Sequence, residues 1–403
     1  MKKQAMKAAR MAATTVPKLI PTRQHVKQKK YQVKNLWTGT NLFTRLFGTD
    51  AAVGSSNSAR KIVCFGNVLL DHTAQVTDTE LFERFELKPD MKGELDPEKL
   101  SELRDEICKC LDCQPNIGGS ALNTVRILRQ LGTDALFFGA VGEDKRAEKL
   151  KGILKERGVE TRLQSIAEAP TGQCICLVHN QTAAQYADIG ASVKFSVDFL
   201  KHAECDAKQA PFLRPIERKQ ILYIEGYFVP QREDVSQYIV KSYIYQRRRL
   251  ALNLSAEYII QENYDMLLFL VRNAYFIFGN QNEFQTLCDH MKFDSIEAMA
   301  KELVAGGAIK IMVITKGADG FELISNYIDE YSKAGDLSFQ CFYAPRVERV
   351  VDTTGAGDAF VAGFLHAFLE KRSLTECMRI AGVVSAHVVT QIGCNLPENI
   401  KLT

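Results

Sequence analysis

From residue 61 onward, short runs rich in apolar and β-branched residues alternate with longer stretches in which apolar residues recur at helical spacing. This alternation predicts βαβ units, and therefore an α/β fold with a mainly parallel sheet flanked by helices. Several of the short runs are apolar at almost every position, which is typical of central strands covered on both faces. The predicted strands cover residues 61–66, 135–141, 221–224, 250–254, 275–278 and 310–315.

The amphipathic stretches predict the helices that cover this sheet. They span residues 97–111, 121–131, 146–157, 234–246, 281–290, 295–304, 356–369 and 374–389. Asn282, Asp294 and Ser373 are candidate cap or first-turn residues, because their side chains can accept hydrogen bonds from free amides at a helix start. The run 359–368 is apolar on all sides, as expected of a helix buried against a sheet.

Two less regular stretches, 72–117 and 160–193, interrupt the alternation. They contain strand-like pieces such as 174–178 and are long for simple connections within a compact domain. We expect them to form a small β-rich lid against the sheet, inside one domain that covers 60–403. Such a lid would exclude water from a reaction beneath it.

The composition is typical of a soluble globular protein, with 46% hydrophobic and 25% charged residues. A chain of 403 residues is long enough for one large α/β domain with a smaller attached element. No run of eighteen apolar residues occurs, so we expect neither a membrane span nor a membrane partner.

Positive charge is concentrated at the start of the chain. Residues 1–49 carry eleven Lys and Arg and no acidic residue, whereas the rest of the chain is mildly acidic. We expect a basic, disordered extension over 1–59 and a cytoplasmic protein; a nuclear address or a mitochondrial presequence is the alternative for this extension.

The eleven cysteines are scattered, apart from the cluster Cys108-x-Cys110-x-x-Cys113. No hydrophobic signal region begins the chain, so reduced thiols inside the cell are expected. The cluster lacks the second ligand pair of zinc motifs and lies in a helical pattern, which favours ordinary thiols over a metal site.

The segment 351–360, Val-Asp-Thr-Thr-Gly-Ala-Gly-Asp-Ala-Phe, carries the clearest chemistry of the chain. Gly355 and Gly357 open a predicted helix, whose free amides and positive dipole end attract an anion. Asp358 lies just inside the helix, where it can take a proton from an alcohol while the amides of Gly355, Ala356 and Gly357 hold a phosphoryl group. The segment therefore predicts phosphoryl transfer, the alternative being an ordinary Gly-rich turn.

A second glycine pair, Gly118-Gly119, opens the helix predicted from residue 121, and Asn123 follows one turn later. The glycines allow a ligand to approach the backbone closely, and an Asn side chain can both donate to and accept from sugar hydroxyls. The alternative is a tight turn. Together the two glycine segments make the chain resemble the ribokinase-like (PfkB) family of carbohydrate and nucleoside kinases. Within that family it is most similar to the adenosine kinases, in residues 67–71, 87–89, 118–123, 253–256 and 392–398.

This resemblance covers about residues 61–400 and implies a three-layer α/β kinase fold with a lid. It also implies a monomer that transfers phosphate from ATP, with Mg²⁺, to the 5′-hydroxyl of adenosine, with no nucleic acid required. Asp358 corresponds to the catalytic base, and Asp71, Gly119 and Asn123, next to Gly118, correspond to the ribose site. For Asp71 the alternative is a turn carboxylate at the end of a strand.

The resemblance also implies a slot for the purine base. Asn67 is expected near the base, and Phe228 and Tyr258 are expected as aromatic walls, because flat rings stack on a flat base. The alternative for both aromatic residues is core packing, which is common for this residue type.

For the nucleotide and its metal ion, the resemblance implies two further segments. Asn280 and Glu283 match an Asn-x-x-Glu motif that helps to hold Mg²⁺ and its waters, the alternative being a solvated helix start. Thr315, Lys316 and Gly317 match a segment that lines the ATP site, although Lys316 could equally point into solvent.

Several positions depart from the adenosine kinase pattern. Thr354, a candidate substrate-binding residue, stands where these enzymes usually carry Asn and where sugar kinases of the family carry Thr. An ungapped comparison also places unusual residues in the lid, namely Lys92, Glu94, Gln181, Ala183 and Gln185. The alternatives are therefore a kinase of another nucleoside or sugar, or a catalytically weak nucleoside-binding pseudokinase.

Overall fold

The computed structural model describes residues 62–77, 79–89, 91–111, 113–180, 182–205, 220–244, 248–329, 332–397 and 400. The described residues belong to one compact unit. The basic extension expected over 1–59 and the lid residue Gln181 lie outside them. Among these residues no helix is both long and apolar enough to span a bilayer.

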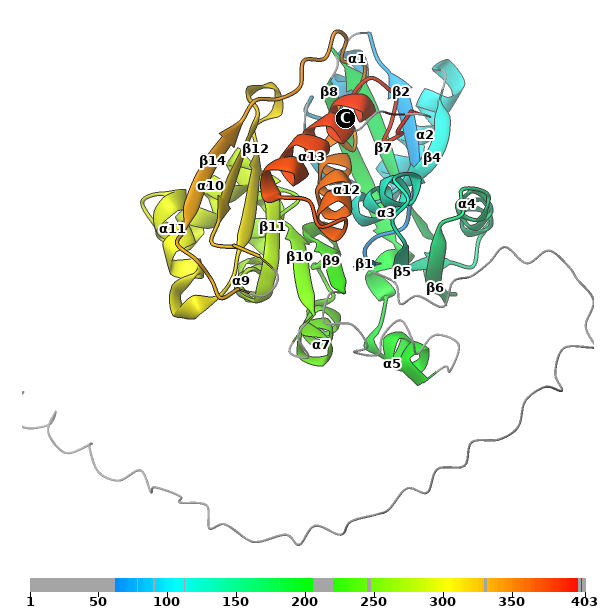
Figure 1. The fold of residues 1–403 in the computed structure, drawn as a ribbon. Coiled ribbons are helices and arrows are strands. Elements are labelled where there is room, and N and C mark those ends of the chain that lie inside the picture. Colours follow the sequence, from blue (N-terminus) through cyan, green and yellow to red (C-terminus); the bar gives the residue numbers. More distant parts are fainter. Residues whose placement is uncertain are drawn as a thin grey trace, which may run out of the picture. The chain divides into compact units, whose positions relative to one another are not determined.

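The main element is a nine-stranded sheet with the order β14-β13-β12-β11-β10-β9-β1-β5-β6 (Figure 1). Neighbouring strands pair in parallel from β12 through β11, β10, β9, β1 and β5 to β6, while β13 and β14 are added antiparallel beside β12. All six predicted strands are confirmed, as β1 (Ile62–Phe65), β5 (Ala135–Gly142), β9 (Ile221–Glu225), β10 (Arg249–Asn253), β11 (Ala274–Asn280) and β12 (Ile311–Thr315). Three strands at or next to the two edges were not predicted for this sheet: β6 (Glu160–Ile166), β13 (Phe321–Ser325) and β14 (Ser338–Phe342).

Helices cover both faces of this sheet, so the expected three-layer α/β architecture is confirmed. Ile62 and Cys64 of β1 belong to one apolar cluster, and Val63 and Phe65 belong to another, because successive side chains of a strand point to opposite faces. The first cluster contains α3 (Ser120–Gln130), α4 (Lys145–Glu156), α12 (Ala356–Leu369) and α13 (Leu374–Val388). The second contains α5 (Val197–Cys205), α7 (Glu233–Ser242), α8 (Glu257–Glu262), α9 (Tyr264–Asn273), α10 (Gln281–His290) and α11 (Ile296–Leu303).

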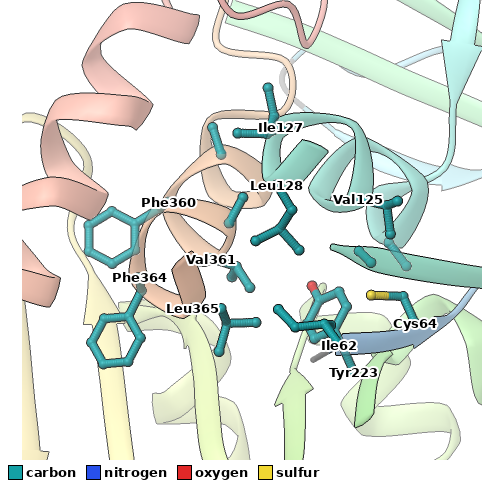
Figure 2. Close-up of a cluster of buried hydrophobic side chains, with 14 of the residues drawn as sticks. Ile62, Cys64, Val125, Ile127, Leu128, Tyr223, Phe360, Val361, Phe364 and Leu365 are labelled. Atoms are coloured by element: carbon teal, nitrogen blue, oxygen red, sulfur yellow. The ribbon is translucent and has the colours of Figure 1, made fainter. Parts of the chain in front are cut away.

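The helix α12 is buried on nearly all sides, as its apolar sequence predicts. Figure 2 shows Val361 and Leu365 on the side of α12 that faces Leu128 and Ile62. Phe360 and Phe364 point to the other side of the helix, where their rings pack on Phe321 and on Phe276 and Phe278. This packing fixes the N-terminus of α12 relative to α3, and both glycine segments begin these two helices.

Of the three residues predicted to cap a helix or to lie in its first turn, two do so. Ser373 is confirmed as the N-cap of α13, where its hydroxyl accepts from the Glu376 amide. Asn282 lies in the first turn of α10, whose cap is Asn280. Asp294 lies outside α11, because Ser295 caps that helix.

A second sheet forms the lid, with the order β3-β8-β7-β2-β4. Its strands are β2 (Leu69–Gln75), β3 (Lys92–Glu94), β4 (Gln114–Gly118), β7 (Thr171–His179) and β8 (Thr182–Gly190). The helices α1 (Glu80–Arg84) and α2 (Pro97–Cys110) pack on one face through an apolar cluster that includes Phe82, Leu103 and Ile175. The expected lid boundary at 160 was wrong, because β6 pairs with β5 in the large sheet and the second lid segment begins with β7.

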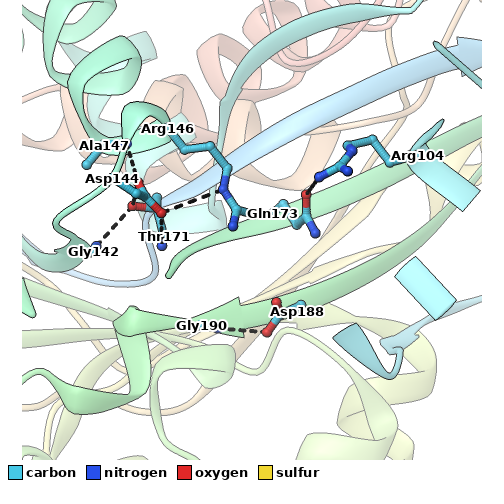
Figure 3. Close-up of polar contacts among 9 residues, drawn as sticks. All are labelled: Arg104, Gly142, Asp144, Arg146, Ala147, Thr171, Gln173, Asp188 and Gly190. Atoms are coloured by element: carbon cyan, nitrogen blue, oxygen red, sulfur yellow. Dashed lines mark hydrogen bonds and ion pairs between the residues drawn. The ribbon is translucent and has the colours of Figure 1, made fainter. Parts of the chain in front are cut away.

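The lid strand β7 is held to the large sheet at its first residue (Figure 3). The Asp144 carboxylate caps α4 by accepting from the Ala147 amide at 2.9 Å, and it also accepts from the amide and hydroxyl of Thr171 at 2.8 and 2.7 Å. The Thr171 hydroxyl in turn accepts from the Gly142 amide at 2.9 Å. The end of β5, the start of α4 and the start of β7 are therefore joined at one point.

Candidate active site

A cavity of about 280 Å³ is lined by the lid sheet, the carboxyl ends of the large sheet and the start of α12. Four parallel strands end in polar residues of its wall, Glu225, Asn253, Asn280 and Thr315, and Asn67 lies two residues after the end of β1. Ligands of open α/β sheets bind outside the carboxyl ends of the strands, because strand ends and helix starts leave backbone groups and side chains free there. This cavity is the candidate active site.

The loop before α12 is shaped by a buried carboxylate. Asp352 is fully buried and accepts from the amides of Thr354 at 2.8 Å and Gly393 at 2.7 Å. Gly355 has φ of +74°, and a Cβ there would lie 2.3 Å from the Cβ of Cys394, so the turn requires glycine at this position. The loop is thus held in one conformation from both sides.

The three amides predicted to hold a phosphoryl group all line the cavity, but they are not equivalent. The Ala356 amide donates to the Thr353 carbonyl at 3.2 Å. A Cβ added to Gly357 would meet nothing within 4 Å, so a ligand can come close to this part of the helix start. The dipole of a fourteen-residue helix adds positive potential at the same place.

The catalytic candidate Asp358 faces the start of α3. Its Oδ1 accepts from the Ser120 hydroxyl at 2.6 Å, and its Oδ2 accepts from the Asn123 amide group at 3.0 Å. Burial raises the pKa of Asp358 above its ordinary value, while these two hydrogen bonds oppose the rise. A carboxylate that is held in place and made more basic is suited to removing a proton. The two glycine segments therefore meet at this side chain, as the sequence predicts.

Asn123 lines the cavity and also has protein partners. Its Nδ2 donates to Asp358, and its Oδ1 accepts from Arg126 at 3.0 Å. These contacts orient the side chain, so Asn123 also helps to position the Asp358 carboxylate.

Arg126 was not predicted as part of the site. Its guanidinium is buried and donates to the carbonyl of Ile117, to the Asn123 side chain, and to the carbonyl of Cys394 and side chain of Asn395, at 3.0 to 3.1 Å. Burial lowers the pKa of Arg126 to about 10, so the group is still cationic at neutral pH. An arginine on the buried face of a predicted helix was the available signal, because an Arg is rarely buried without partners.

The predicted ribose residue Asp71 lies on β2 and lines the cavity. Its Oδ1 is buried and has no hydrogen-bond partner among the described residues. Burial raises the pKa of Asp71 to about 7, against the effect of nearby Arg126. A buried acceptor without a partner is costly unless a ligand donates to it, as a sugar hydroxyl would.

The two glycines beside Asp71 are required by close contacts. A Cβ at Gly118 would lie 1.7 Å from Oδ1 of Asp71, and a Cβ at Gly119 would lie 2.1 Å from the Asn67 carbonyl oxygen. Gly119 also has φ of +102°, which other residues rarely adopt. Gly119 lines the cavity, whereas Gly118 acts behind it by making room for the carboxylate.

One predicted aromatic wall is corrected. Phe228 is fully buried in the core, with the guanidinium of Arg232 4.5 Å from its ring centroid, and it does not line the cavity. Its neighbour Tyr227 takes that place, together with the predicted Tyr258, and the two ring centroids are 6.3 Å apart. The hydroxyl of Tyr227 donates to the Ser255 carbonyl at 3.0 Å, which fixes the ring.

Asn67 lines the cavity beside these rings, in a fixed orientation. Its Nδ2 donates to the Tyr227 carbonyl at 3.0 Å, and its Oδ1 accepts from Arg232 at 2.8 Å. Arg232, which was not predicted, is buried and therefore sets the position of both Asn67 and Phe228.

Glu225 is a second residue that was missed. It is fully buried at the end of β9, its Oε1 accepts from the Asn67 amide at 3.4 Å, and its Oε2 has no partner among the described residues. Burial raises the pKa of Glu225 to about 8. Because it lines the cavity, this carboxyl adds an uncommitted polar group to the end that holds Tyr227.

Glu225 is expected to make the stability of the protein depend on pH. Between the ordinary value of 4.5 and about 8, the folded protein holds a proton that the unfolded chain has released. The free energy of unfolding therefore falls as the pH rises through this window, by up to about 1.4 kcal/mol per pH unit. Asp71, whose pKa is also raised, contributes in the same direction up to about pH 7. Glu225→Gln should therefore reduce this slope, and should remove most of it between pH 7 and pH 8, in urea unfolding curves recorded from pH 5 to pH 8.5. Glu257→Gln, at an exposed position of α8, should leave the slope as it is in wild type; equal slopes in wild type and Glu225→Gln would contradict the assignment.

The altered lid residues do face the cavity. Lys92 and Glu94 of β3 and Ala183 and Gln185 of β8 all line it, and Lys92 is opposite Gln185 in the strand register. The lid therefore contributes two charged side chains and one amide to the wall of the cavity.

The Asn280 and Glu283 pair forms a capping box at the start of α10. Asn280 Oδ1 accepts from the Glu283 amide at 2.9 Å, while the Glu283 carboxylate accepts from the Asn280 amide at 3.0 Å and from its Nδ2 at 2.8 Å. Glu283 is nevertheless on the cavity wall. Carboxylate and amide oxygens suit Mg²⁺, which keeps several waters, so this pair fits a hydrated ion better than a dehydrated one.

The three residues expected at the ATP site are only partly brought to the cavity. Thr315 lines it, and its hydroxyl donates to the Gly279 carbonyl at 3.4 Å. Lys316 and Gly317 do not line it, and Lys316 forms an ion pair with Glu322 rather than pointing freely into solvent.

Thr354, the candidate substrate-binding residue before α12, does line the cavity. Its buried hydroxyl oxygen is unpaired among the described residues.

Known proteins resemble this chain over most of its length. The pfkB family carbohydrate kinase model matches residues 93–401. Adenosine kinase 2 of Arabidopsis thaliana is 27% identical over 354 residues, which is 85% of this chain and 98% of the relative.

Two solved structures extend the comparison. Anopheles gambiae adenosine kinase in complex with P1,P4-di(adenosine-5) tetraphosphate has a TM-score of 0.72 and 25% identity, over 84% of this chain and 97% of that one. Schistosoma mansoni adenosine kinase in complex with 2-fluoroadenosine has a TM-score of 0.74 and 21% identity, over 85% and 98%. With the family model matched over more than half of its length, the chain belongs to the pfkB family of carbohydrate kinases.

Proposed function

We propose that this protein is an adenosine kinase, which transfers the γ-phosphoryl group of ATP to the 5′-hydroxyl of adenosine and yields AMP and ADP. One observation carries the proposal: Asp358, held by Ser120 and Asn123, lines the same cavity as the start of α12 and Asp71, whose Oδ1 has no partner among the described residues. The cavity thus combines a base, an anion site and an acceptor for sugar hydroxyls. The adenosine kinases among the relatives support adenosine as the acceptor.

In this mechanism the protein holds the nucleoside at two ends. Asp71 accepts from the ribose hydroxyls, and Tyr227 and Tyr258 lie against the base, since aromatic rings pack favourably on a flat purine. The 5′-hydroxyl is then directed toward Asp358, which lines the same cavity.

Asp358 removes the proton of the 5′-hydroxyl as its oxygen bonds to the γ-phosphorus of ATP, and the bond from that phosphorus to the bridging oxygen of ADP breaks. Ser120 and Asn123 keep the carboxylate directed at the hydroxyl. The amides and the dipole at the start of α12 stabilise the negative charge on the phosphoryl oxygens. The lid strands β3 and β8 reduce the access of water.

Charged groups near the loop before α12 favour a nucleotide there. A second hollow is lined by Arg346, Arg349 and His387, with Val383 and Ala386 of α13 beside them. Glu348 also lines this hollow, and residues 345–351 lead directly into the loop that carries Gly355. The hollow is therefore a candidate for part of the nucleotide site.

A magnesium ion is expected to require Glu283. When bound, Mg²⁺ would neutralise charge on the ATP phosphates. The Glu283 carboxylate would hold waters of the ion's hydration shell. Glu283→Gln should raise the Mg²⁺ concentration that gives half-maximal activity by about tenfold, by analogy with losses at outer-shell ligands. Glu376→Gln weakens the similar capping box of α13, outside the cavity, and should leave this concentration unchanged. An equal effect of both substitutions would mean that the motif serves only the helix.

A kinase of another nucleoside or of a sugar is the second candidate. It is favoured by the unpaired hydroxyl of Thr354 and by the polar groups of Glu94, Gln185 and Glu225 in the cavity. A coupled assay for ADP with purified protein separates the two, using adenosine, guanosine, inosine, cytidine, ribose and fructose at equal concentrations. Adenosine should give the highest kcat/KM.

Higher turnover with another acceptor would overturn the choice of adenosine. Thermal stabilisation by adenosine without turnover of any acceptor would instead identify a nucleoside-binding pseudokinase.

We also propose that the enzyme acts as a monomer in the cytoplasm and serves purine salvage. Every residue assigned to the site comes from one chain, so no second copy is needed to complete it. Analytical ultracentrifugation tests whether the protein is a monomer in solution. Fluorescent fusions with and without residues 1–59 test whether the basic extension directs the protein to the nucleus or to mitochondria.

A further inference from the structure

Three potential metal ligands lie together in the lid, outside the proposed kinase site. His72 of β2, Cys108 of α2 and Cys113 before β4 each offer one ligand atom, and these atoms all lie within 4.8 Å of one another. The Nδ1 of His72 is 3.7 Å from the Sγ of Cys113. The three side chains come from three different segments, so their proximity is a property of the fold.

We propose that His72, Cys108 and Cys113 bind a zinc ion. Imidazole nitrogen and thiolate sulfur are the usual ligands of Zn²⁺, at about 2.0–2.3 Å, which puts neighbouring ligand atoms of a tetrahedral site about 3.5–3.8 Å apart. The pair of His72 and Cys113 is already at such a distance. Bringing Cys108 to the same distance requires a shift of about one ångström, which a side chain in the last turn of a helix can make.

Exposure and charge at this site also suit zinc. Cys108 is exposed, so ions can enter and a water molecule can serve as the fourth ligand. Arg104, Lys149 and Arg146 place positive charge near His72, and Figure 3 shows Arg104 and Arg146 beside lid strand β7. Two thiolates and a neutral imidazole balance the charge of Zn²⁺, so the occupied site would add no net positive charge beside these cations.

The sequence pattern alone favoured ordinary thiols, because Cys108-x-Cys110-x-x-Cys113 lacks a second ligand pair. The missing ligand comes from β2, which pairs antiparallel with β4 and places His72 opposite Pro115, two residues after Cys113. A bound ion would link α2, the start of β4 and β2. It would thereby fix the strand that carries Asp71, and this role does not depend on which acceptor the enzyme phosphorylates.

Metal binding to the full chain tests the proposal. Protein purified with a chelator and a phosphine reductant is titrated with Co²⁺, whose thiolate complexes absorb in the near ultraviolet, and Zn²⁺ is then added as competitor. We expect one equivalent of Co²⁺ with thiolate absorption, displaced by Zn²⁺. Cys113→Ser and His72→Ala should each weaken Zn²⁺ binding by more than the roughly 10–100-fold loss that outer-shell changes cause.

Cys341→Ser is the matched control, because Cys341 is another exposed thiol but lies on β14, away from the lid. It should leave Zn²⁺ binding unchanged. Hydrogen exchange provides a second readout, in which Zn²⁺ should slow exchange in α2 and β4 of wild type but not of Cys113→Ser. Absence of the Co²⁺ absorption, or its persistence in both lid variants, would overturn the proposal.

Discussion

Asp358→Asn is expected to lower kcat for adenosine by about 10²–10⁴-fold, the usual loss when a general base is removed. The amide is similar in shape and can keep contacts to Ser120 and Asn123, but it cannot accept the proton of the 5′-hydroxyl. The site should otherwise persist, so adenosine should stabilise the variant against heat as much as it stabilises wild type. Steady-state kinetics and thermal unfolding with adenosine measure the two effects.

Asp198→Asn is the control for this experiment, because its carboxylate is exposed on α5 and pairs only with nearby Lys201. It should change neither kcat nor stability appreciably, as surface ion pairs contribute little. Wild-type kcat in Asp358→Asn would show that another group removes the proton. Loss of adenosine binding would show that Asp358 mainly holds the nucleoside.

Arg126→Met is expected to impair both stability and catalysis. The buried guanidinium donates to two carbonyls and two side chains that join α3 to the segment after α13, and methionine can form none of these four hydrogen bonds. Removing a buried charged partner typically costs about 3–5 kcal/mol. Because Asn123 then loses its support, Asp358 should be less well positioned and kcat should fall. Urea unfolding and steady-state kinetics measure the two losses.

Arg129→Met provides the comparison on the same helix. Arg129 is half-exposed and pairs with Asp134 at 3.5 Å, so its loss should cost about 1 kcal/mol or less. Arg126→Lys keeps the charge but cannot reach four acceptors, and it should recover only part of the stability. Equal stability of the Arg126 and Arg129 variants would show that the buried network contributes little.

Much of the fold was predictable because its signals are local. Central strands such as β9 and β12 are continuous apolar runs, and the start of α12 carries its chemistry in four consecutive residues. The boundary of the lid was harder to predict. Strand β6 is only half-buried at the edge of the large sheet, so its sequence resembles that of an irregular lid strand.

Site residues were predicted correctly where the backbone conformation allows only one residue type. They were missed where contacts between distant segments determine which side chain reaches the cavity. Gly119 and Gly355 are required by positive φ angles, so the sequence reveals them. Which of Tyr227 and Phe228 faces the cavity depends on a short 3₁₀ turn that periodicity does not resolve. Arg126 and Glu225 act through partners far away in the chain, which a pattern of neighbouring residues does not reveal.

The contacts of Gly393, Cys394 and Asn395 also bear on how the protein is made. These residues follow every other assigned site residue in the chain, yet they bind Asp352 and Arg126, which shape the loop and support the base. On the ribosome, they emerge after the large sheet and the lid have already been synthesised. A nascent chain therefore possesses its catalytic carboxylate before it possesses the support for it, and phosphoryl transfer can begin only once this last segment has docked.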